Sequence, residues 1–94
     1  MTLEDIRNVD DLHQFVHEAL CEKENLLENQ FETHRSMLHK SEKVCGIHFA
    51  LKGPRNLRLS AVWSADQNTV LFYDAKGERY SKTALPRYLN APSS

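Results

Sequence analysis

Three side chains of types that bind transition metals recur at helical spacing near the amino terminus. His13, His17 and Cys21 follow one another at intervals of four residues, so neighbouring members lie one helical turn apart. Over eight residues an α-helix drifts by about 80°, which carries Cys21 away from the line of His13. The chain contains no HExxH or CxxC motif. A polar flank beside an apolar stripe explains the same spacing, so we predict no metal site and no cofactor, and keep a metal site on the helix as the last-ranked hypothesis.

Two other pairs of residues have the types needed for catalysis. Cys45 and His48 could act as nucleophile and base, but residues three apart on a strand point to opposite faces. The adjacent acids Asp10 and Asp11 are typical of a helix start, where carboxylates favour the positive end of the helix. The chain has no glycine-rich phosphate loop and no GxSxG motif. We therefore predict no catalytic residues and a protein that is not an enzyme.

A mixed group of basic, aromatic and apolar residues is the strongest candidate for a binding surface. If the second half of the chain forms an antiparallel sheet, strand alternation places most of the group on the face opposite the core. Tyrosine rings beside cations suit the bases and phosphates of single-stranded nucleic acid. Apolar residues beside them suit a protein contact. The candidate surface comprises His48, Arg55, Arg58, Val62, Leu71, Tyr73, Tyr80 and Lys82.

This surface supports two ranked functional hypotheses. The first is a non-enzymatic interaction domain that binds a protein partner, or itself as a homodimer, through the exposed sheet face. The alternative is single-stranded nucleic-acid binding by the same face. A solvated sheet face with no ligand explains the same residue types. The facing of Tyr80 and Lys82 depends on the turn at Lys76-Gly77, because a bulge there would shift both.

One amphipathic helix is expected to cover the sheet, at about residues 9–28. Asn8 can cap free N–H groups at the start of this helix. Lys23 interrupts the apolar stripe, so either its stem lies along the surface or the helix ends sooner. The stripe consists of Leu12, Phe15, Val16, Ala19, Leu20, Leu26 and Leu27.

From residue 44 the hydrophobic period changes to two, which indicates strands joined by hairpin turns. An edge strand at 33–39 is expected, with a continued helix through Leu38 as the alternative. The fold class is therefore α+β, with an N-terminal helix packed on a four- to five-stranded antiparallel β-meander over about residues 33–84. The expected cross-strand pairs are Phe49 with Leu59, Cys45 with Trp63, Trp63 with Val70, and Ala61 with Phe72. The expected strands are 44–51, 57–63, 69–75 and 79–83, followed by a flexible tail at 86–94.

Composition and charge describe one globular domain spanning residues 1–94. The 94 residues are 40% hydrophobic and 27% charged, which is ordinary globular composition. The acidic amino terminus, the lack of a long apolar run and the small number of cysteines predict a cytoplasmic protein with no membrane partner. Residues 1–42 hold ten acids and four bases, whereas residues 43–94 hold eight bases and three acids. Either the two halves neutralise each other, or the basic half faces a polyanion.

Several short pieces between residues 45 and 85 carry a resemblance to a known family. They are Cys45-Gly46, Gly53-Pro54-Arg55, Asn68-Thr69, Leu71-Phe72-Tyr73 and Gly77-Glu78-Arg79. On these pieces the stretch resembles a group of small uncharacterised bacterial proteins of the planctomycete type. The resemblance covers a little under half of the chain and implies no activity. It implies a hairpin with a tight turn before the cysteine, which favours the edge-strand interpretation of 33–39.

Overall fold

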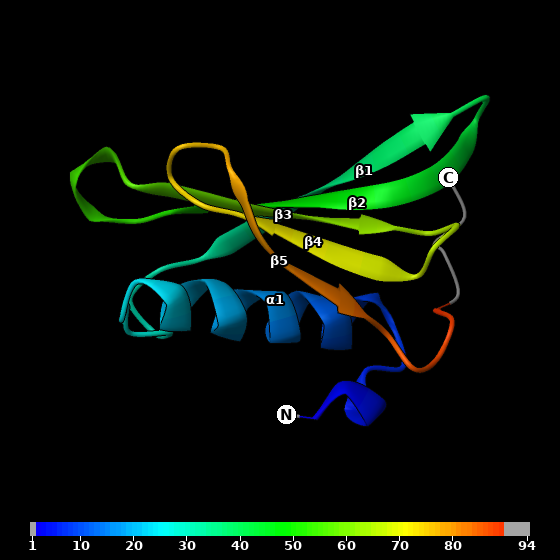
Figure 1. Ribbon diagram of the computed structural model, residues 1–94, viewed down its shortest axis with the longest axis horizontal. Coiled ribbons are helices and arrows are strands. Elements are labelled where there is room, and N and C mark those ends of the chain that lie inside the picture. Colours follow the sequence, from blue (N-terminus) through cyan, green and yellow to red (C-terminus); the bar gives the residue numbers. More distant parts are fainter. Residues whose placement is uncertain (1, 90–94) are drawn as a thin grey trace.

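One helix packs on a five-stranded antiparallel sheet, as expected for the α+β class. The structure is a computed structural model that describes residues 2–89, and the sheet order β1-β2-β3-β4-β5 follows the chain (Figure 1). Each strand pairs with its sequence neighbour, so the sheet is an open meander. The elements are η1 (Leu3–Asp5), α1 (Val9–Lys23), β1 (Thr33–Lys40), β2 (Lys43–Lys52), η2 (Pro54–Asn56), β3 (Arg58–Ser64), β4 (Thr69–Tyr73) and β5 (Arg79–Ala84).

Helix α1 begins at the expected cap and ends five residues before the expected end. At its start the Asn8 side chain accepts a hydrogen bond of 2.8 Å from the Asp11 N–H. At its end Asn25 has a positive φ of 55°, and the Leu26 N–H donates to the carbonyl of Cys21. This is a Schellman motif with asparagine in the left-handed position. The prediction of a helix to residue 28 was wrong, and Leu27 is 59% exposed.

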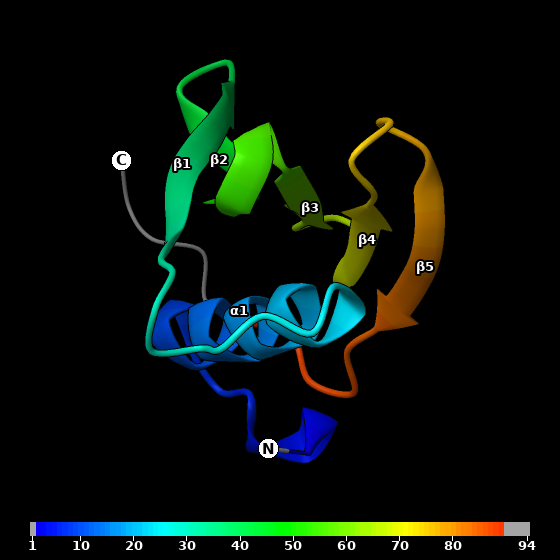
Figure 2. The same ribbon diagram turned by 90° about the vertical axis from the view of Figure 1, so that its left-hand side faces the viewer.

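The core lies between α1 and the concave face of the sheet. Figure 2 shows the sheet curving around α1, with β1 and β5 at opposite edges. Leu12, Val16 and Leu20 of the helix are completely buried, and they belong to one cluster with Phe49 and Trp63 of the sheet. Within residues 2–89, no helix has both the length and the apolar content needed to cross a bilayer.

The strand pairing confirms the expected faces, although one expected register was wrong. Trp63 pairs with Val70, as predicted. Phe49 pairs with Ala61 instead of Leu59, and Trp63 pairs with Ile47 instead of Cys45. Both errors are slips of two residues. A slip of two leaves every side chain on its original face, so the expected core and outer faces of β3 and β4 are both observed.

Strand β1 confirms the edge-strand interpretation of residues 33–39. It pairs with β2 from Thr33 to Lys40. The two strands are joined by Ser41 and Glu42, which have φ values of 52° and 69°. Positive φ at both central residues matches the twist of a tight hairpin, which here contains no glycine.

The segment after β5 packs into the core instead of forming a flexible tail. Leu85 and Leu89 are each only 8% exposed. The side-chain amide of Asn68 donates to the carbonyls of Leu85 and Arg87, which fixes the segment to the β3–β4 turn. The expectation of a flexible tail was therefore wrong for residues 86–89, and residues 90–94 of that expectation lie outside the described residues.

Candidate functional site

The convex side of the sheet forms a broad face that α1 does not cover (Figures 1 and 2). We call it the outer face. Cross-strand pairing aligns His48, Val62, Leu71 and Lys82 in one row across β2 to β5. The strand residues on this face are His34, Ser36, Leu38, Gly46, His48, Ala50, Lys52, Arg58, Ser60, Val62, Ser64, Thr69, Leu71, Tyr73, Lys82 and Ala84.

The outer face carries cations and no carboxylates. Within the described chain, none of the five strands contains an aspartate or glutamate. No carboxylate in residues 2–89 forms an ion pair with Lys52, Arg58 or Lys82. The acids of the first half of the chain lie on η1, on α1 and in the connections instead. Three of the eight bases of the second half, Lys52, Arg58 and Lys82, therefore lie on a face that carries no strand carboxylate.

The sheet places an apolar spot at the centre of the outer face. Val62 and Leu71 pair directly across β3 and β4, and both remain half-buried. Tyr73, on the same face of β4, pairs with Ser60 and is also half-buried. The expected positions of these residues are confirmed, as are those of His48, Arg58 and Lys82.

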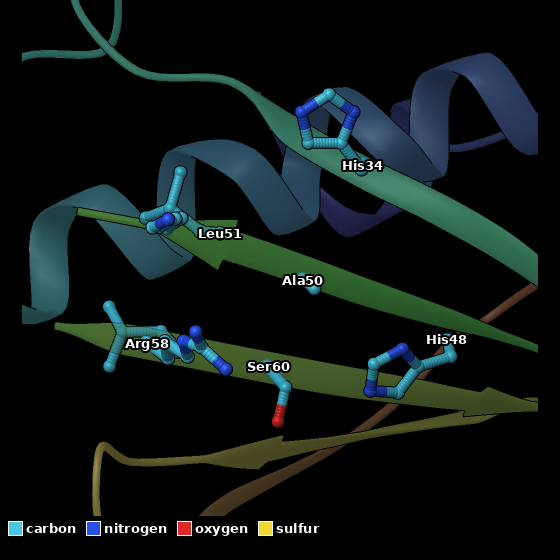
Figure 3. Close-up of a pocket in the computed structure, with 8 residues that line it drawn as sticks. His34, His48, Ala50, Leu51, Arg58 and Ser60 are labelled. Atoms are coloured by element: carbon cyan, nitrogen blue, oxygen red, sulfur yellow. The ribbon is translucent and has the colours of Figure 1, made fainter. Parts of the chain in front are cut away.

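A hollow of about 400 Å³ opens beside this apolar spot, at one end of the β2–β3 pair. Ala50 and Ser60 pair at its centre, and their small side chains leave space between larger neighbours. Figure 3 shows the imidazole of His48 and the guanidinium of Arg58 extending from opposite directions toward Ser60. The other lining residues are His34, Leu51, Lys52 and Leu59. His34, Ala50 and Ser60 were not predicted from the sequence to form part of a site.

Tyr80 does not belong to the outer face, which corrects one predicted site residue. The turn before β5 is closed by hydrogen bonds between Asp74 and Glu78, so it is longer than two residues. Phe72 pairs with Ser81 while Tyr73 pairs with Arg79, which leaves Tyr80 as an extra residue. Its ring lies 6.1 Å from that of Phe72, on the helix side.

The surroundings of Tyr80 are part of a second hollow, between α1 and β5. The Nζ atom of Lys23 lies 4.8 Å from the centre of the Tyr80 ring. Burial, and then the charges of Glu24 and Asp74, raise the pKa of the Tyr80 hydroxyl. This hollow of about 370 Å³ also contacts Phe15 and Ala19 of the helix.

Arg55 lies in η2, beyond the edge of the outer face. Its φ of 55° is left-handed, and its side chain is exposed. It does not line the hollow at the β2–β3 pair. Arg55, predicted to lie at a rim of the surface, is therefore in the turn beside this face and does not contribute to its hollow.

The helical histidines have structural partners. The Nε2 atom of His17 donates to the carbonyl of Glu28 at 2.8 Å, and Nδ1 lies 2.8 Å from the Thr33 hydroxyl. Both ring nitrogens thus hold the connection between α1 and β1. Burial, and then the charge of Glu28, raise the pKa of the Cys21 thiol. Within the described residues, no three His, Cys, Asp or Glu side chains gather as a metal site would require.

Neither of the other two pairs considered for catalysis is arranged for it: Cys45 and His48 are apart, and Asp10 and Asp11 have structural partners. His48 lies on the outer face opposite Val62, whereas Cys45 is the extra residue at the bulge of the β1–β2 pair, three positions away along β2. Asp10 forms a 3.0 Å ion pair with Arg35. Asp11 accepts a hydrogen bond from the Arg7 N–H, as a carboxylate at a helix start does.

His13 is expected to make the stability of the domain depend on pH. Its ring meets that of Phe49 edge-on at 5.6 Å, and Arg35 approaches its Nδ1 atom to 3.4 Å. Burial is the main cause that lowers the pKa of His13, and the charges of Arg35 and His17 add to it. The unfolded chain therefore binds a proton more readily, so this contribution to stability is present above about pH 6.5 and is lost as pH falls below it.

We expect the urea midpoint to fall between about pH 7 and pH 5 more steeply in the wild type than in His13→Gln. The comparison uses fluorescence of Trp63, the one tryptophan of the chain, to follow unfolding at each pH. Parallel curves for the two proteins across this window would show that His13 does not contribute to the pH dependence.

Neither a family model, nor a curated protein, nor a solved structure matches the chain. The resemblance over residues 45–85 stays a prediction. The functional argument therefore depends on the geometry and charge of the outer face.

Proposed function

We propose that the chain is a non-enzymatic interaction domain whose outer face binds an acidic segment of a partner protein. The observation that carries the proposal is the composition of this face, which combines the half-buried Val62 and Leu71 pair with flanking cations and no strand carboxylate. Apolar residues at the centre with charged residues around them are the common anatomy of a protein interface.

The charge layout favours an acidic partner over a neutral one. Lys52, Arg58 and Lys82 lie on one face, and within residues 2–89 no ion pair neutralises them. A partner with carboxylates would be steered toward this face and away from the acidic helix on the other side. The central apolar contact would supply affinity, and the surrounding cations would supply orientation and association rate.

Tyr73→Ala tests this proposal because Tyr73 is the aromatic residue of the outer face. A fluorescently labelled peptide of alternating glutamate and leucine serves as the probe, and anisotropy measures its affinity. We expect Tyr73→Ala to weaken binding by about 1 to 2 kcal/mol, as for a moderately important interface aromatic. Tyr88→Ala is the matched control, because Tyr88 is 77% exposed and lies outside the sheet.

Three outcomes would contradict the proposal of an acidic protein segment. The first is no binding of the peptide, and the second is equal loss in the Tyr73→Ala and Tyr88→Ala variants. The third is a stable dimer, measured by light scattering, that becomes monomeric in the Leu71→Lys variant. This result would assign the outer face to a second copy of the chain. Unfolding curves followed by Trp63 fluorescence show whether each variant is folded.

Single-stranded nucleic acid is the second candidate, favoured by the position of Tyr73 on a face without strand carboxylates. The correction of Tyr80 leaves one tyrosine on this face, so the stacking surface is smaller than the sequence predicted. The same two tyrosine variants are titrated with a labelled mixed-sequence oligonucleotide at two salt concentrations. Micromolar binding that weakens with salt, and by about 1 to 3 kcal/mol on Tyr73→Ala, would replace the protein-partner proposal.

A further inference from the structure

We propose that the hollow over the β2–β3 pair is a binding subsite for an oxyanion, either a carboxylate or a phosphate group. This inference rests on the proposed function and deepens it, because it assigns the place where an acidic partner is anchored. The hollow is bounded by Arg58, Lys52, His48 and His34, with the Ser60 hydroxyl between them.

The shape of the hollow follows from the strand register. Ala50 pairs with Ser60, while Lys52 pairs with Arg58 at the turn end of the β2–β3 hairpin. His48 precedes Ala50 on the same face by two residues, and His34 pairs with Ala50 from β1. A small pair surrounded on these sides by longer side chains creates a depression on an otherwise regular sheet face (Figure 3).

The chemistry of the lining residues selects an anion. The Arg58 guanidinium is a planar set of donors that matches a carboxylate or phosphate, and Lys52 adds an ammonium group. The Ser60 hydroxyl and the imidazole N–H groups supply further donors. Within residues 2–89, one ion pair involves a lining residue of the hollow: the Glu32 carboxylate lies 3.9 Å from His34 Nε2, and its side chain is 84% exposed.

The same residues argue against a metal ion in this hollow. Two imidazoles alone are an incomplete ligand set, since structural zinc sites use four protein ligands and catalytic sites use three. Lys52 and Arg58 line the same hollow and would repel a divalent cation.

The experiment is an amide NMR titration of the full chain with sodium phosphate and, separately, sodium acetate, at constant pH and ionic strength. We expect saturable shifts centred on residues 48–52 and 58–60 with at least one of the two anions. A response to phosphate alone assigns a phosphoryl group, and a response to both assigns carboxylates as ligands too. No saturable response to either anion would overturn the inference.

Two variants test whether the response comes from the hollow. Arg58→Gln should weaken binding by roughly tenfold, because it removes a charge-assisted contact. Arg55→Gln is the matched control, since it makes the same charge change three residues away without lining the hollow. Equal losses in both variants would show a diffuse charge effect and overturn the inference.

Ala50→Ile fills the centre of the hollow while it retains every cation. Isoleucine suits a half-exposed strand position, so the sheet should tolerate the change. We expect anion binding to be lost in this variant, and unchanged binding would overturn the inference. If the anions fail while the acidic peptide still binds in a Tyr73-dependent manner, the proposed function survives and only the subsite is rejected.

Discussion

Asn68→Asp is expected to lower the free energy of unfolding by about 3 kcal/mol or more. The side-chain oxygen of Asn68 accepts a 3.0 Å hydrogen bond from the indole N–H of Trp63. Its amide nitrogen donates to the carbonyls of Leu85 and Arg87. Asn68 is only 2% exposed, so an aspartate would place a buried negative oxygen against two carbonyl oxygens.

This change should also release the segment at residues 85–89 from the core, because its side-chain anchor is lost. Urea unfolding followed by Trp63 fluorescence measures the loss of stability, and Trp63 is hydrogen-bonded to the altered residue. Asn56→Asp is the matched control, since Asn56 also has a positive φ, of 63°, but is exposed in η2. Similar midpoints for the two variants would show that the hydrogen bonds of Asn68 contribute little to stability.

The role of Asn68 illustrates why the sequence missed the packing of the carboxy-terminal segment. Asn68 was expected only to turn the chain between two strands, which it does with a φ of 49°. Its contacts to residues 85 and 87 are long-range, and no local pattern indicates them. Pro86 also favours a surface interpretation, although the neighbouring Leu85 is buried.

The predicted end of the helix was wrong for a different reason. Leu26 and Leu27 continue the apolar spacing, so hydrophobic periodicity alone extends the helix. The Schellman hydrogen bonds around Asn25 end it at Lys23 instead. Asparagine is one of the residues that favour the left-handed position after a helix, so the cap indicates an earlier end than the hydrophobic period does.

The sheet was predicted well because strand alternation is insensitive to slips of two residues. The face of each strand residue depends only on its parity, which the apolar pattern shows directly. The predicted face of Tyr80 was wrong because a bulge breaks that parity. The hollow beside His48 could not be predicted from the sequence either, because it depends on the pairing of Ala50 with Ser60 across two strands.

Gly46→Ala is expected to destabilise the domain by about 3 kcal/mol, through a clash between neighbouring strands. A Cβ atom on Gly46 would fall on the carbonyl oxygen of Trp63, well inside van der Waals contact. The oxygen belongs to the backbone of β3, so no side-chain rotation can relieve the overlap. The β2–β3 pair would have to separate at the point where Trp63 enters the core.

Gly77→Ala separates this clash from the general cost of replacing a glycine. Gly77 has a φ of 80°, but a Cβ atom there meets nothing within 4 Å. We expect it to cost only about 1 kcal/mol, from backbone strain. Urea midpoints of both variants decide between the two causes: a cost for Gly46→Ala no greater than that for Gly77→Ala would mean that β2 and β3 accommodate a methyl group at this crossing. A larger cost for Gly46→Ala would show that close approach of the two strands, rather than backbone freedom, requires glycine at this position.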